Sequence, residues 1–155
     1  MKLITLSIAL VVCFTTVVFA SPNVPDDISK ALSTADQILI FRLSPHKENG
    51  DFHNTQIESH VAISDPAVIQ TITSDILQSL SEKANSARCF NPHHGVRVIS
   101  KSRIYDLVIC YECRSYKFYY DSQSGFGTFG GSSALLDEHL LTATEKAEQG
   151  AAANP

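Results

Sequence analysis

The chain has 155 residues with 12 basic and 16 acidic side chains, and its formal net charge is −4 when histidine is neutral. Affinity for nucleic acid rests on lysine and arginine side chains that neutralise phosphates, so this acidic balance argues against nucleic acid as a partner. The length is that of one domain that can bury its own core.

Residues 1–20 have the three parts of a cleavable secretion signal. Lys2 gives a positive start, an apolar run extends to Phe19, and Ala20 ends the segment with a small side chain. Removing this signal leaves 11 basic and 16 acidic residues and a net charge of −5. We therefore expect a periplasmic or secreted protein that has no membrane span after cleavage, in a compartment where disulfides persist.

The first elements of the mature chain are predicted to be a short helix and a hairpin. Residues 27–36 carry apolar side chains three and four positions apart, which is the spacing of an amphipathic helix. Residues 37–43 form a short, β-rich apolar run, and residues 55–63 alternate apolar and polar side chains. Residues 45–50 separate the two runs with proline and glycine, so the runs should pair as antiparallel strands.

The clearest helix begins after Asp65 and Pro66 and extends to about Lys83. Asp65 can accept hydrogen bonds from the first amides of the helix, and Pro66 suits the first turn because its missing N–H costs nothing there. Apolar residues follow at helical spacing. Such a stripe must be buried against another surface.

A meander of three strands is predicted next, over residues 95–100, 104–113 and 114–121, and a closing helix begins near Ser132 or Ser133. Together these elements predict a single α+β domain over residues 21–145. It would have two layers, an antiparallel sheet of about five strands with the helices packed on one face. Residues 146–155 are expected to be a disordered tail.

The chemistry of the chain is concentrated in a Cys/His cluster made of Cys89, His93, His94, Cys110 and Cys113. The mature protein keeps three cysteines, and an odd number in an exported protein leaves one sulfur as a free thiol, a metal ligand or an intermolecular partner. A two-residue turn at 101–102 would bring all five side chains toward the open end of one hairpin.

Three interpretations of the cluster remain open. The first is a structural disulfide that joins Cys89 to Cys113 or to Cys110 and leaves the other cysteine buried. The second is a zinc or copper(I) site made of the three thiolates with His93 or His94. A strand through residues 110–113 disfavours it, since it would put Cys110 and Cys113 on opposite faces. The third is a redox-active Cys-x-x-Cys pair.

The letters CFNPHHGVR from Cys89 and DLVICYEC from Asp106 resemble the signature CFxPxHG followed by DLVICFxC. That signature is typical of an uncharacterised family of small exported bacterial proteins. The resemblance covers about a quarter of the mature chain and implies a bacterial envelope protein. It carries no activity, ligand or catalytic residue with it.

Three further patterns have simple structural explanations. The glycines at 125, 127 and 130 match the letters of a dinucleotide fingerprint, but the chain offers neither a second parallel strand nor an acidic residue at the required distance. Turn glycines around a short strand with buried Phe126 and Phe129 explain them better. In the two-residue register Asp106 faces Arg97 as a surface ion pair, and His53 is expected to be a solvated hairpin histidine.

The sequence therefore predicts a small non-catalytic binding or interaction domain whose Cys/His hairpin stabilises the fold. Its partner would be an envelope or extracellular protein or a small ligand. The aromatic strand and the Gly/Phe segment after it would supply the contact surface, because aromatic side chains carry much interface energy. The residues are Tyr116, Phe118, Tyr120, Phe126 and Phe129. The alternative is a metal-binding or thiol-active protein. No Ser/His/Asp signature or nucleophile elbow indicates an enzyme or a catalytic residue.

Overall fold

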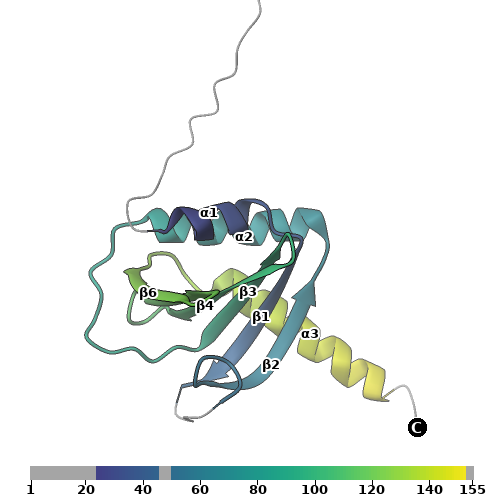
Figure 1. Cartoon of the computed structure of the whole chain (residues 1–155). Coiled ribbons are helices and arrows are strands. Elements are labelled where there is room, and N and C mark those ends of the chain that lie inside the picture. Colours follow the sequence, from purple (N-terminus) through teal and green to yellow (C-terminus); the bar gives the residue numbers. More distant parts are fainter. Residues whose placement is uncertain (1–23, 46–49, 153–155) are drawn as a thin grey trace, which may run out of the picture.

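The computed structural model describes residues 24–45 and 50–152, with side chains as far as residue 143. The predicted signal peptide and residues 153–155 of the predicted tail lie outside these ranges. The helices and strands, shown in Figure 1, are α1 Asp26–Ser33, β1 Gln37–Ser44, β2 Gln56–Ile63, α2 Pro66–Ser81, β3 His94–Ser100, β4 Arg103–Cys110, β5 Ser115–Tyr120, β6 Gln123–Thr128 and α3 Ala134–Ala152.

The strands form one sheet in the order β2-β1-β3-β4-β5-β6, and every neighbouring pair is antiparallel. The expectation of about five strands is therefore one short, because β6 adds a sixth at the edge. Its glycines read as turn residues in the sequence. In the fold a Cβ at Gly127 would lie 2.5 Å from the Tyr116 ring, so glycine at this position leaves room for that ring to lie across β6.

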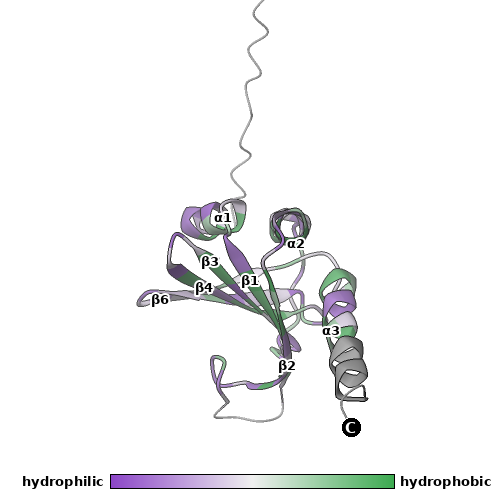
Figure 2. Ribbon diagram, turned by 90° about the vertical axis from the view of Figure 1, so that its right-hand side faces the viewer, coloured by the Kyte–Doolittle hydropathy of each residue, from purple (hydrophilic) through white to green (hydrophobic). Residues whose placement is uncertain are grey.

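The prediction of an α+β fold with an antiparallel sheet is confirmed. Figure 2 shows α1 and α2 side by side over one face of the sheet, with α3 beside the β2 edge. Buried residues from all three helices form one cluster with inward-facing residues of the strands, including Ile40, Val96 and Leu107. Burial of this continuous apolar surface is the main stabilising contribution to the fold.

The predicted local signals are present where they matter for the site. The Asp65 carboxylate accepts hydrogen bonds from the amides of Ala67 and Val68 at 2.9 and 3.1 Å, and Pro66 is the first residue of α2. Lys101 and Ser102 have φ values of 49° and 64°, as a two-residue hairpin turn requires. This turn fixes the register of β3 against β4.

The opposite face of the sheet carries a smaller apolar cluster of Phe41, Leu43, Phe52 and Val108. The residues after Gly50 fold back so that Phe52 is buried over β1 and β3. A Cβ at Gly95 would approach the Phe52 ring to 2.6 Å, so this glycine allows the close contact. The sheet is therefore covered on both faces near β3.

The last helix extends farther than the sequence pattern indicates. α3 ends at Ala152, so residues 146–152, expected to be part of a tail, continue the helix. Within the part of the chain that the structure describes, no helix is long and apolar enough to cross a membrane.

Candidate functional site

The Cys-x-x-Cys segment is a tight turn and not a continuous strand. β4 ends at Cys110, β5 begins at Ser115, and the four residues between them form a turn. Arg114 has a φ of 51°, and its amide donates to the Tyr111 carbonyl at 3.1 Å. The predicted strands over 104–113 and 114–121 are therefore wrong at this end, because the reversal occurs within the motif itself.

This turn sets the disulfide pairing. It brings the Cα atoms of Cys110 and Cys113 within 5.2 Å, and the two residues form a disulfide. The expected pairing of Cys89 with Cys113 or Cys110 is wrong, because that expectation rested on an extended backbone between residues 110 and 113. Cys89 is instead an exposed free thiol.

All three sulfurs nevertheless lie together. The Sγ atom of Cys89 is 3.1 Å from the Sγ atom of Cys113. Cys110 and Cys113 are only 1% and 0% exposed, so Cys89 is the sulfur that solvent reaches. The cluster consists of one accessible thiol in contact with one end of a buried disulfide.

Backbone amides point at both buried sulfurs. The amide of Cys113 donates to the Cys110 sulfur at 3.2 Å, and the amide of Asn91 donates to the Cys113 sulfur at 3.4 Å. The segment that carries Cys89 is tied to the turn a second time, where the Ala87 amide donates to the Cys113 carbonyl at 3.0 Å. N–H groups in these positions stabilise negative charge on sulfur.

Two buried hydroxyl groups flank the turn. The hydroxyls of Tyr111 and Ser115 are fully buried, and neither has a hydrogen-bond partner among the described residues. Burial raises the pKa of Tyr111, and the charges of Asp75 and Asp137 raise it further. Buried polar groups without partners are rare in folded proteins, and here one belongs to the Cys-x-x-Cys turn and the other to the residue that begins β5 just after it.

The histidines of the motif belong to a neighbouring pocket. His94 is 6% exposed, and its Nε2 atom lies 3.0 Å from a carboxylate oxygen of Asp137, which Arg42 also contacts. Burial lowers the pKa of His94 although Asp137 opposes the effect. Burial would raise the pKa of Asp137, but hydrogen bonds from Ser133, His94 and Arg42 lower it to about 2. The side chain of His93 faces Asn91 at 3.5 Å.

This pocket has a volume of about 220 Å³ and is lined by Arg42, His93, His94, Tyr111, Glu112, Ser133 and Asp137. Tyr111 and Glu112 are the central residues of the Cys-x-x-Cys turn, so the pocket and the sulfurs share a wall. The structure does not bring either histidine into one ligand set with the sulfurs. With the disulfide closed, the described residues include no group of three or more ligands that could hold a metal ion.

The prediction that these aromatic residues form a contact surface is largely wrong. Tyr116, Tyr120 and Phe129 are 0%, 6% and 1% exposed, and Phe118 is partly buried against the same core. Tyr116, Phe118 and Tyr120 lie on the face of β5 that points toward the helices. The sequence of the strands alone does not show which face the helices cover. Phe126 alone is exposed, at 57%. The expectation that Phe126 would be buried is wrong as well, since it lies on the other face of the sheet edge.

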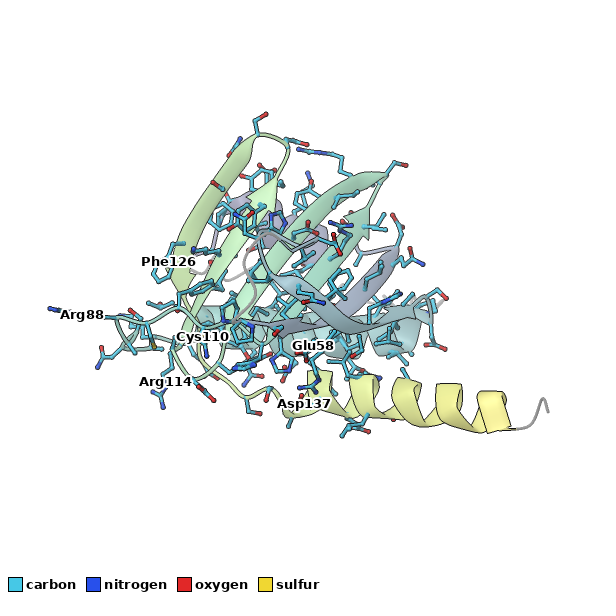
Figure 3. All side chains as sticks on the ribbon, turned by 90° about the horizontal axis from the view of Figure 1, so that it is seen from below. Glu58, Arg88, Cys110, Arg114, Phe126 and Asp137 are labelled. Atoms are coloured by element: carbon cyan, nitrogen blue, oxygen red, sulfur yellow. A yellow bond between two sulfur atoms is a disulfide. The ribbon has the colours of Figure 1, made fainter. Side chains whose placement is uncertain are left out.

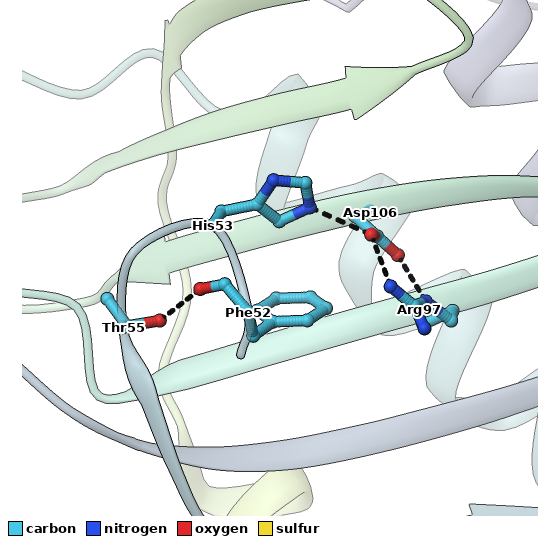
Figure 4. A network of polar contacts seen from close by, with 5 residues as sticks. All are labelled: Phe52, His53, Thr55, Arg97 and Asp106. Atoms are coloured by element: carbon cyan, nitrogen blue, oxygen red, sulfur yellow. Dashed lines mark hydrogen bonds and ion pairs between the residues drawn. The ribbon is translucent and has the colours of Figure 1, made fainter. Parts of the chain in front are cut away.

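The sequence pattern predicted only part of a polar network on the opposite face. Asp106 is 4% exposed and accepts two hydrogen bonds from Arg97 and one contact from His53, each 2.8 Å long. Figure 4 shows how His53 reaches over the sheet to this carboxylate. The His53 ring also stacks on Tyr119 at 3.7 Å. The predicted cross-strand pair is thus present but buried, and His53 is not simply solvated.

Comparisons with protein-family models, with curated proteins and with solved structures found no match to this chain. Its function must therefore be inferred from the geometry of the site.

Proposed function

We propose that this protein exchanges thiols and disulfides with an exported partner, with Cys89 as the entry point and Cys110–Cys113 as the internal acceptor. The observation that carries the proposal is the 3.1 Å separation between the Cys89 and Cys113 sulfurs. Reacting atoms about 3 to 3.5 Å apart are already close to the geometry of reaction. Export through the predicted signal peptide would supply an oxidising compartment.

The transfer step balances without any further reagent. The Cys89 thiolate attacks the Cys113 sulfur, the Cys110–Cys113 bond breaks, and Cys110 leaves as a thiolate. The amide of Cys113, which donates to the Cys110 sulfur at 3.2 Å, stabilises the charge that develops on this leaving group. The products are a Cys89–Cys113 disulfide and a buried Cys110 thiolate, and the reverse step restores the first pairing.

Exchange with a partner uses the accessible sulfur. In the direction that oxidises this protein and reduces the partner, Cys89 of the reduced protein attacks a disulfide of the partner. This step forms a mixed disulfide and releases one partner thiolate. Cys113 then attacks the Cys89 sulfur and releases the second partner thiolate, and Cys110 finally attacks Cys113. Two electrons pass from the buried pair to the partner, and Cys89 ends as a free thiol.

Oxidised glutathione tests this order of events. We expect the fully reduced protein to form a transient adduct at Cys89, followed by loss of the adduct and closure of Cys110–Cys113, as measured by acid quenching and intact mass. In Cys113→Ser the adduct should accumulate. In Cys89→Ser, oxidation of the buried pair should slow by at least about tenfold, because glutathione must then react directly with a buried sulfur and the step between adjacent sulfurs is lost. A stable adduct in the wild-type protein, or a Cys89→Ser variant that oxidises at the wild-type rate, would overturn the proposal.

A second candidate function is binding of zinc or copper(I) by the reduced protein. It is favoured by one specific observation, the tight turn of the Cys-x-x-Cys segment, since paired thiolate ligands commonly lie on such turns. The cluster would offer three thiolates, a soft ligand set that suits copper(I), whereas zinc needs a fourth ligand. Anaerobic titration of the reduced protein with each metal should show one bound ion, lost on replacing any of the three cysteines by alanine. No binding in the reduced wild-type protein would contradict this candidate.

A further inference from the structure

The residues around Cys89 form a surface with a definite chemical character. We call it the Cys89 surface and define it as Arg88, Phe90, Arg114, Lys117 and Phe126. Figure 3 shows Arg88, Arg114 and Phe126 gathered at the end of the molecule that holds Cys110. The Phe90 and Phe126 rings lie 6.3 Å apart, and the Lys117 ammonium lies 4.5 Å from the centre of the Phe90 ring. Phe90 directly follows Cys89 in the chain.

No acidic side chain in the described part of the chain forms an ion pair with the cations of this surface. Among the described residues, the arginine ion pairs within 4.0 Å use Arg42, Arg97 and Arg103. Arg88 and Arg114 are exposed and Lys117 is half-buried, and none of the three has such a pair within the described ranges. Glu112 shares the turn with Arg114, but it lines the pocket beside α3. A local excess of positive charge therefore surrounds Cys89 on a chain whose net charge is −4.

The sheet ends beside this surface. β6 is the last strand in the sheet and pairs with β5 on one side only. Outward-facing N–H and C=O groups of an edge strand can pair with an extended segment of another chain. Within β6 the side chains on the same face as Phe126 are the small Ser124 and Thr128, and the Phe126 ring is 57% exposed.

We propose that the Cys89 surface docks an extended, acidic segment of a partner polypeptide, with a cysteine placed against Cys89. The inference rests on the proposed thiol exchange and adds the chemical class of the substrate. The aromatic pair would bind an apolar side chain of the segment, the edge of β6 would pair with its backbone, and Arg88, Arg114 and Lys117 would attract its acidic residues. Because the protein as a whole is acidic, such a segment is repelled elsewhere and attracted here.

Peptides of equal length test the proposal. Each carries one central cysteine as a mixed disulfide with a chromogenic thiol, flanked by acidic, neutral or basic residues. Attack by Cys89 releases the chromophore, so the initial rate with the oxidised wild-type protein measures productive docking. We expect the acidic peptide to react about tenfold faster than the basic peptide at low ionic strength, and the difference to shrink in salt.

Variants separate docking from reactivity. The double variant Arg88→Glu with Arg114→Glu should abolish or reverse the preference, whereas the control Lys30→Glu, which reverses one exposed charge on α1, should keep it. Phe126→Ser should slow all peptides but leave the rate with uncharged 2,2′-dithiodipyridine unchanged. If dithiodipyridine reacts normally while peptide charge has no effect, the docking inference fails and thiol exchange stands.

Two other outcomes are also decisive. If neither peptides nor dithiodipyridine react with Cys89, the proposed function itself fails. If sedimentation shows that the protein forms a dimer which Phe126→Ser dissociates, the surface is occupied by a second copy of this chain, and the docking inference is overturned.

Discussion

Replacing Asp106 by asparagine tests whether the network beneath His53 stabilises the fold. The carboxylate is 4% exposed, and three donor contacts of 2.8 Å converge on its two oxygens. Asparagine keeps the size of the side chain but replaces one acceptor oxygen with an NH2 group. In either orientation that NH2 group faces a donor of Arg97, so at least one charge-assisted hydrogen bond is lost.

The expected cost is about 2 kcal/mol in the free energy of unfolding at pH 7. A hydrogen bond to a charged group contributes about 1.5 to 3 kcal/mol. We take the lower part of that range because the Arg97 side chain retains 33% exposure, so solvent screens its charge. Urea unfolding measures the change. Asp121→Asn is the control, since Asp121 also pairs with an arginine but the pair is exposed, and no measurable change is expected there.

The pH dependence gives a second check on the same network. Burial would raise the pKa of Asp106, but hydrogen bonds from Arg97 and His53 outweigh it and lower the pKa below 3.8. A carboxylate with a lowered pKa adds stability above its unfolded pKa and loses it as the pH falls through the folded value. The difference between wild type and Asp106→Asn should therefore persist from pH 7 to about 5 and shrink below about 4. Equal stabilities at pH 7, or a difference that stays constant into acid, would refute the reasoning.

Three further substitutions have direct readouts in urea unfolding. Gly95→Ala should cost about 1 to 3 kcal/mol, since the new Cβ would lie 2.6 Å from the buried Phe52 ring, and no loss would mean that Phe52 is not seated there. Tyr111→Phe should cost nothing or gain up to about 1 kcal/mol, because its buried hydroxyl has no partner within the described chain, and a clear loss would reveal one. Phe126→Ser should change stability by less than about 0.5 kcal/mol because the ring is exposed, and a larger loss would contradict that exposure.

The sheet and helices were predictable where one local signal dominates. Asp65 with Pro66 defines the start of α2, and the turn at Lys101 and Ser102 fixes the register that places Asp106 opposite Arg97. Both signals act between residues close in sequence. β6 was harder to predict, because its glycines are needed to make room for the rings of Tyr116 and Phe118 on the neighbouring strand. A contact between strands is not visible in the pattern of one strand.

The sequence predicted which cysteines lie together better than it predicted how they pair. The three cysteines do lie together, but their pairing depends on the turn at Arg114, a non-glycine residue with a positive φ that the sequence does not announce. His94 does not join the cysteines as expected, because its ring contacts Asp137, 43 positions later in the chain. The network of His53 and Asp106 joins residues 53 positions apart. Long-range partners of this kind require the fold.

The backbone around each sulfur distinguishes Cys89 from the two cysteines of the disulfide. Cys110 and the turn after it are held between paired strands, and the Phe129 amide fixes the turn further by donating to the Arg114 carbonyl at 3.0 Å. Cys89 lies in the irregular segment between α2 and β3, and hydrogen bonds from Ala87 and Asn91 tie that segment to the turn. Moving Cys89 away from Cys113 therefore costs a few loop contacts and leaves the strand ladder intact, whereas moving Cys110 would break the ladder. The fold thus combines a disulfide held between paired strands with an exposed thiol on an irregular segment, which is the division that the proposed stepwise exchange requires.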